Sequence, residues 1–379
     1  MRFASILLVT QVLPYTLLAQ SIRPALTAAR ESPPGSFGTI VAVRELSDTR
    51  LLVVDQAEPQ VHLATGAKSP VGRAGRGPGE YTRVQKLVAL GGDSTWFEDP
   101  QARRWHLFAG ITGLTSVDLR DITPRGLPRL LGADRSGRVL YSLSSGRYRQ
   151  TPGIPRVESG LTAESLTVFV RARDPRQYNR FPMAAQTVAG LKGMNALQTQ
   201  AYRPVLPNGA PILWQLVSPL ATAEQSLLFA DGWIVIAYLD PYRVDWISPQ
   251  GHRTAGAPLP FTPVRTSNAL RQRMVKAHWP EVSPPFSEKD LPPWPDVLPP
   301  FRPDALIAAP DGSLLIQRVV DPASNTTVYD IIDRSGKLLR QLRLPAAERI
   351  VGSGARHIYI VARDDDELER LRQVRWPMP

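Results

Sequence analysis

The chain has 379 residues, of which 43% are hydrophobic, and carries a formal net charge of +11 with no cysteine. The lack of cysteine excludes disulfides, a cysteine nucleophile, thiolate metal sites and a lipid-modified cysteine anchor. The basic residues are scattered and never form a run of five, so the sequence predicts no nucleic-acid partner.

The first 19 residues have the pattern of a secretory signal peptide. Arg2 supplies a positive charge, residues 3–18 are almost wholly apolar, and Ala19 offers a small residue for cleavage. A retained membrane anchor is the alternative, but Gln11 and Pro14 interrupt a run that is already short for a bilayer span. We therefore predict cleavage near Ala19, export to the periplasm or beyond, and no stable membrane span in the mature protein.

After a predicted N-terminal linker at residues 20–35, the sequence becomes internally repetitive. Short apolar runs end in an acidic residue, then a polar turn, a second run and a glycine follow. Corresponding positions 44 residues apart are Asp55 and Asp99, His62 and His106, and Gly66 and Gly110. Self-similarity at a fixed period of this length is typical of repeat architectures.

Apolar runs of the same kind recur to the end of the chain. Their anchors are Leu52, Trp96, Leu140, Ile234, Leu315 and Tyr359, in steps of 44, 44, 94, 81 and 44 residues. The two long steps indicate insertions. The runs are four to six residues long, with glycine, aspartate and proline between them, which favours strands over helices. Four short strands per 40 to 45 residues is the period of a propeller blade.

We therefore predict an all-β domain over residues 36–379, a six-bladed β-propeller. Seven blades are the minor alternative, in which the 94-residue step holds an additional blade. Residues 373–376 and a strand near residues 39–43 are expected to share one blade and close the ring.

Residues 72–81 read GRAGRGPGEY, and 298–303 read LPPFRP before APDGSLL at 309–315. Together with the signal peptide and the blade spacing, these passages resemble bacterial exported six-bladed β-propellers of the NHL-like type. The resemblance implies the fold, and it implies no activity, because most members of that family have none assigned.

The glycine-rich residues 72–81 do not have the order of a phosphate-binding loop, which needs a helix after the glycines. Pro78 and Gly79 instead suit a type II turn. We interpret the segment as the connection between the first two blades, with Glu80 placed to meet Arg73 or Arg76.

No set of residues has the spacing of a catalytic, cofactor or metal site. The five histidines, which we interpret as structural, are His62, His106, His252, His278 and His357. Aspartates at strand ends, Asp55, Asp99 and Asp240, are typical of turns. Asp364, Asp365, Asp366, Glu367 and Glu369 lack the alternating ligands and glycine of a calcium loop, so we predict a solvated acidic hairpin.

Residues 264–303 form the larger insertion. Thr266 or Ser267 is placed to cap a helix that carries Leu270 and Met274 at helical spacing. A proline-rich stretch with four aromatic residues follows, which we interpret as a plug packed on one propeller face. A lid that grips a ligand is the alternative.

Together these features favour a monomeric, non-catalytic binding or scaffolding propeller with no cofactor and an unknown ligand. Protein, peptide and envelope polysaccharide all stay open as partners, and anionic polymers suit the positive charge. The alternative is a metal-dependent hydrolase or lactonase of the six-bladed type, which needs acidic, asparagine or histidine side chains that converge from the inner strands.

Overall fold

The computed structural model describes residues 21–22, 30–31, 37–64, 68–110, 114–119, 128–144, 150–151, 154–155, 161–170, 186–195, 199–202, 214–217, 220, 222–278 and 294–376. Most of these residues lie in β-strands, together with the helix α2 (Asn268–His278) and a 3-10 turn at Pro322–Ser324. The predicted all-β class is confirmed. The predicted signal peptide, residues 1–19, lies outside the described residues.

Antiparallel runs of four strands dominate the structure. The first two are β3 (Ile40–Glu45), β4 (Leu51–Asp55), β5 (Gln60–Ala64) and β6 (Lys68–Pro70), then β9 (Lys86–Ala89), β10 (Ser94–Asp99), β11 (Arg104–Ala109) and β12 (Leu114–Asp118). An eight-stranded sheet contains β13 (Arg129–Ala133), β14 (Arg138–Ser144), β17 (Leu161–Val170), β18 (Gln186–Asn195), β21 (Gln225–Leu228), β22 (Ile234–Leu239), β23 (Tyr242–Ile247) and β24 (Arg253–Ala255).

The last two sheets also take strands from the N-terminal segment. The first consists of β25 (Phe301–Ala308), β26 (Leu314–Arg318), β27 (Thr326–Ile332), β28 (Leu338–Pro345) and β1 (Ser21–Ile22). The second consists of β29 (Glu348–Ser353), β30 (His357–Arg363), β31 (Glu369–Arg375) and β2 (Arg30–Glu31). Short pairs join β7 (Arg73–Ala74) to β8 (Glu80–Tyr81), β15 (Gln150–Thr151) to β16 (Ile154–Pro155), and β19 (Thr199–Tyr202) to β20 (Trp214–Val217).

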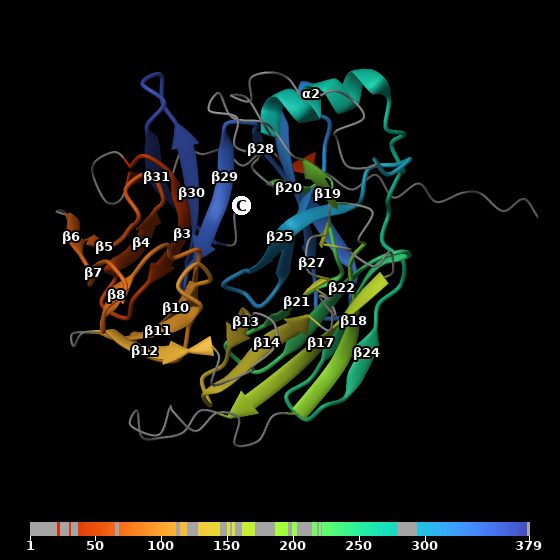
Figure 1. Ribbon diagram of the computed structural model, residues 1–379. Coiled ribbons are helices and arrows are strands. Elements are labelled where there is room, and N and C mark those ends of the chain that lie inside the picture. The colour runs from red at the N-terminus through yellow and green to blue at the C-terminus, as the bar shows by residue number, and fades with distance from the viewer. Residues whose placement is uncertain are drawn as a thin grey trace, which may run out of the picture.

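The sheets are arranged around a common centre in the manner of a propeller (Figure 1). The inner strands lie side by side in the order β3, β9, β13, β21, β25, β29, and β29 lies beside β3.

Counted as separate sheets of four or more strands, the described residues form five blades, not the predicted six. The count is five because β13 and β21 pair in parallel, with Gly132 opposite Leu228. Glycine permits this approach, since a Cβ at Gly132 would lie 2.4 Å from the Leu228 carbonyl oxygen.

The core lies between neighbouring runs. Each predicted anchor occupies the second strand of a four-strand run, and all six side chains are buried. Aromatic residues fill the layer between the second and third runs, where Trp105 makes edge contacts with Trp96 and Tyr141. Similar apolar layers join the remaining neighbours. Because the burial is shared between faces of adjacent sheets, no single run can bury its apolar surface alone.

Ring closure differs from the prediction. Residues 39–43 do not share a sheet with the C-terminal strand, because Ile40–Glu45 is the inner strand of the first run. The N-terminal strand that pairs with β31 is β2, with Arg30 opposite Gln373. The segment predicted as a linker therefore contributes two short strands, one to each of the last two sheets.

The predicted helix in the insertion is confirmed. The Ser267 hydroxyl accepts a hydrogen bond from the Leu270 amide at 3.2 Å, as an N-cap does. Leu270 is buried against Leu220 and Leu298, which precede β21 and β25. Phe301 is not part of an insertion but begins β25, where it is fully buried. Residues 279–293 lie outside the described part, so the plug stays a prediction.

The glycine-rich segment forms the turn that the sequence predicts. Glu80 donates its amide to the Gly77 carbonyl across Pro78-Gly79, and Gly79 has φ +74°. The Glu80 carboxylate accepts from Arg73 Nε at 2.7 Å and from the Gly77 amide at 2.7 Å. Of the two predicted partners, Glu80 therefore pairs with Arg73. The segment connects the first and second runs, as predicted.

Replacing Gly79 by valine should lower the free energy of unfolding by about 1 to 3 kcal/mol, because a β-branched residue is strained at positive φ. A Cβ at this position meets nothing closer than the Leu114 carbonyl oxygen at 3.7 Å, so the effect is conformational and not steric. Gly79→Asn should cost less, since asparagine tolerates this region. Chemical denaturation of both variants measures the difference, and equal stability of all three proteins contradicts the assigned turn.

Candidate ligand-binding site

Charged and polar side chains gather where the inner strands begin. Lys86 is the first residue of β9, Arg129 of β13 and Gln225 of β21, while Asp304 lies within β25. Glu98, at the end of β10, is the direct cross-strand partner of Lys86. We call these five residues the axial cluster. They come from four successive runs, whose inner strands lie side by side around the common centre.

An ion pair crosses from the third run to the fifth within this cluster. Arg129 Nη2 donates to both carboxylate oxygens of Asp304, at 2.8 and 3.0 Å. The two side chains are 54% and 61% exposed, so ligands in solution can reach them. Partial loss of hydration acts to raise the pKa of Asp304, but the charges of Arg129 and Lys86 outweigh this effect and lower the pKa below its usual range.

The backbone around Asp304 is distorted to present this carboxylate. The register of β25 against β26 shifts between Phe301 and Leu306, and Asp304 itself has φ +53°. Bulges that re-aim a side chain and residues held at positive φ concentrate at functional sites. The distortion gives Asp304 an orientation that a regular strand would not.

Gln225 holds this distortion in place from the neighbouring run. Its side-chain oxygen accepts from the Ala305 amide at 2.9 Å, and its side-chain nitrogen donates to the Arg302 carbonyl at 2.5 Å. The two hydrogen bonds bracket Asp304 on both sides. Gln225 is therefore a positioning residue for the Asp304 carboxylate.

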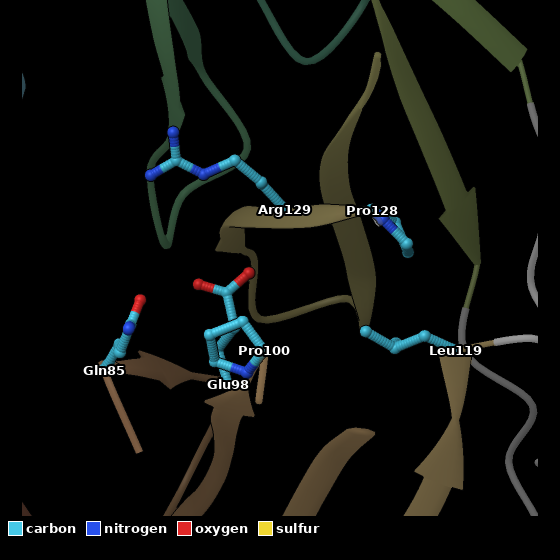
Figure 2. Close-up of a pocket in the computed structure, with 6 residues that line it drawn as sticks. All are labelled: Gln85, Glu98, Pro100, Leu119, Pro128 and Arg129. Atoms are coloured by element: carbon cyan, nitrogen blue, oxygen red, sulfur yellow. The ribbon is translucent and has the colours of Figure 1, made fainter. Parts of the chain in front are cut away.

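A small cavity of about 180 Å³ lies beside the ion pair. Its lining consists of Gln85, Glu98, Pro100, Leu119, Pro128 and Arg129. In Figure 2 the Glu98 carboxylate points toward the strand that carries Arg129, and Pro128 and Leu119 lie to the right of Glu98 in this view. The cavity is smaller than the roughly 300 to 1,000 Å³ of sites for drug-sized ligands, so it has room for one small group.

Glu98 is buried in the wall of this cavity. Its Oε1 accepts from the Leu130 amide at 2.7 Å. Burial raises the pKa of Glu98, and the positive charge of Lys86 only partly opposes that effect. A carboxyl group with a raised pKa can donate as well as accept a hydrogen bond when it is protonated.

The histidines do not form a site in the part of the chain that the structure describes. His62 and His106 lie on the third strands of the first two runs, both buried, as the repeat predicts. His252 is exposed in the turn before β24, and His357 begins β30, with its Nδ1 3.9 Å from Glu45 Oε2. Nothing is described of the His278 side chain. Among described residues, no group of three or more potential metal ligands comes together.

Asp55 and Asp99 have the structural role that the sequence predicts, in a more specific form. The Asp55 carboxylate accepts from the amides of Gly38 and Thr39 at 2.9 and 2.8 Å. Asp99 accepts from the Thr82 amide at 2.5 Å. Each carboxylate thus holds the segment that leads into the inner strand of its own run. Asp240 lies exposed in the turn between β22 and β23.

The acidic run near the C-terminus divides into two parts. Asp364 accepts from the Leu368 amide and from Arg370 Nε, as expected for a hairpin turn. Glu369 was predicted to belong to the same solvated hairpin, but it is fully buried. Its Oε2 accepts from the Ile40 amide at 2.6 Å and from Arg349 at 2.9 Å. It is buried because β31 begins at this residue, where the last sheet meets the first.

Sequence reasoning missed the axial cluster. Arg129 and Asp304 are 175 residues apart, and neither stands in a motif. The available signal was Pro303-Asp304 in a segment otherwise typical of a strand, since proline within a strand often marks a bulge.

In the described part of the chain, no helix combines the length and apolar composition needed to cross a membrane.

The sequence matches no family model and no curated protein. Similar solved structures include a protein of Bacteroides fragilis NCTC 9343 named as exported (12% identity, 94% of this chain, 98% of that chain, TM-score 0.47). Others are a gluconolactonase from Xanthomonas campestris (10% identity, 94% and 95%, TM-score 0.43) and virginiamycin B lyase from Staphylococcus aureus (10% identity, 91% and 98%, TM-score 0.41). Similarities at this level do not assign an activity to this chain.

Proposed function

We propose that this protein is a non-catalytic binding propeller that works outside the cytoplasm and takes its ligand at the axial cluster. The observation that carries the proposal is the exposed Arg129–Asp304 pair, aimed by a bulge and a residue at positive φ. An exposed ion pair contributes little to stability, about 0 to 1 kcal/mol. A protein that keeps a distorted backbone for so small a gain is better explained by recognition than by folding.

We further propose that the propeller has six blades. The eight-stranded sheet consists of two four-strand runs that meet at the single pair Gly132 and Leu228. Each run contains its own predicted anchor, Leu140 and Ile234. The chain between these anchors contributes β17 and β18 to the outside of the run that begins with β13 and β14. This uses residues that a seventh blade would need.

Export rests on the signal peptide pattern at residues 1–19. We expect the protein purified from its native host to lack these residues, which intact-mass spectrometry measures directly. A mass that retains Met1 to Ala19 contradicts the proposed cleavage.

Binding at the axial cluster is tested with the double variant Arg129→Ala/Asp304→Ala against a panel of short peptides and envelope oligosaccharides. We expect a ligand of the parent to be lost by this variant and kept by Asp48→Asn, at the β3–β4 turn, at the other end of β3. Metal analysis and hydrolysis assays on esters and lactones accompany the screen. Stoichiometric bound metal together with hydrolysis would overturn the proposal in favour of a metal-dependent hydrolase.

A further inference from the structure

Two kinds of surface meet at the axial cluster. The cavity has apolar walls from Pro100, Leu119 and Pro128, and Arg129 belongs to the same lining. An apolar group that enters the cavity therefore lies beside Arg129, the residue whose guanidinium pairs with Asp304. Guanidinium groups prefer carboxylates, because their donors match both oxygens.

The protein already places a carboxylate at this guanidinium. Asp304 contacts Arg129 through both carboxylate oxygens, and both side chains are more than half exposed. Such a pair is weakly held, so an incoming anion can replace Asp304 at little cost. Asp304 thus has the geometry of an internal competitor, a group of the protein that occupies the ligand's position.

The charges around the cluster favour an anionic ligand over a cationic one. Lys86 lies close enough to lower the pKa of Asp304, and Arg83 and Arg302 are exposed near the starts of β9 and β25. When Asp304 is displaced from Arg129, the exposed groups of this region are mostly cationic. A site of this sign attracts anions from solution.

The geometry points to a ligand that carries a carboxylate beside one small apolar group, with the apolar group in the cavity, the carboxylate on Arg129, and Asp304 displaced. This inference rests on the proposed binding function and names its ligand chemistry. Two sources supply such a group, a free small carboxylic acid and the C-terminal residue of a peptide.

The test uses the purified exported protein and N-acetyl-valine, with N-acetyl-valinamide as the uncharged match, in calorimetric or NMR titrations. We expect the acid to bind and the amide to bind at least tenfold more weakly, since a charge-assisted bidentate contact is lost. Arg129→Gln should weaken the acid by a similar factor. Asp304→Asn should strengthen it severalfold, because the internal competitor is removed; Asp48→Asn should change nothing.

The response of Asp304→Asn separates competition from a merely structural role, which predicts equal or weaker binding. A short peptide ending in valine, as free acid and as C-terminal amide, distinguishes the sources: stronger binding of the peptide acid than of N-acetyl-valine assigns the site to chain ends. Equal binding of acid and amide, or no gain from Asp304→Asn, overturns the inference. If an oligosaccharide or internal peptide binds through Arg129 while all carboxylate probes fail, the proposed function survives and this inference does not.

Discussion

Removal of residues 366–379 should unfold the protein or drive it to aggregate, because this segment contains β31, the strand between β30 and β2 in the last sheet. The deletion takes away Leu371, Val374 and Trp376, which are all buried. At about 1.5 to 3 kcal/mol for each large apolar side chain, the loss is roughly 5 kcal/mol or more, comparable with the total stability of many domains.

The same deletion breaks the link between the first and last sheets. Phe37 and Glu369 exchange two backbone hydrogen bonds at 2.9 and 2.8 Å, and the Glu369 carboxylate holds the Ile40 amide. With β31 absent, β30 would present a free edge, and such edges pair with other chains.

Thermal melting and size-exclusion chromatography measure the outcome, with a protein lacking only residues 377–379 as the control. We expect the control to match the parent in both measurements. The longer deletion should elute in the void volume or have a melting temperature far below that of the parent. If the protein without residues 366–379 stays monomeric with an unchanged melting temperature, β31 is not needed to close the ring of sheets, which contradicts the prediction.

The strand repeat was predictable because its signals are local. The anchors Leu52 and Trp96 stand in short apolar segments, each followed by an acidic residue, and the same backbone contacts recur in each four-strand run. Glu80 and Gly79 were predictable for a similar reason, since a turn is specified by residues that adjoin in sequence.

The closing strand and the axial cluster were not predictable in this way. Arg30–Glu31 is too short to show strand periodicity, so the sequence predicts the closing strand at the apolar residues 39–43 instead. The placement of Asp304 depends on a bulge in the fifth run, and Gln225 of the fourth run holds that bulge. A contact between runs follows from how the ring closes, and a single sequence does not contain that information. The count of five blades likewise depends on a contact between runs, the pairing of Gly132 with Leu228.

The second large effect is expected at Asp99, whose side chain is fully buried. Besides the Thr82 amide, it accepts from the Thr82 hydroxyl at 2.9 Å and from the Ala102 amide at 3.0 Å. His106 lies beside it, with Nε2 3.8 Å from Asp99 Oδ2. Replacing Asp99 by alanine orphans these donors, each at about 1 to 3 kcal/mol, so we expect a loss of roughly 3 to 5 kcal/mol.

Exposed Asp48 provides the control, since Asp48→Ala removes a carboxylate whose side chain is 45% exposed. Its partner Arg50 lies in the same turn, and surface pairs of this kind contribute about 0 to 1 kcal/mol. Asp55→Ala should resemble Asp99→Ala, because Asp55 holds the equivalent segment of the first run. Urea denaturation of the three variants should therefore separate them into two groups, and a small effect at Asp99 would show that the segment before β9 needs no anchor.

The pH dependence gives the Asp99 assignment a second, independent measurement. Burial acts to raise the pKa of Asp99, but the nearby His106 and the hydrogen bonds from Thr82 and Ala102 outweigh it and hold the pKa well below the ordinary value of 3.8. A carboxylate with a lower pKa in the folded state binds fewer protons there than in the unfolded chain. Its contribution is therefore fully present above the ordinary pKa and is lost as pH falls below it. Asp99→Asn has no such proton to take up, so the difference in unfolding free energy between parent and variant should be constant from pH 7 to about 5 and shrink below pH 4. A difference that stays constant into strong acid would mean that Asp99 stabilises this segment by shape and not by its charge.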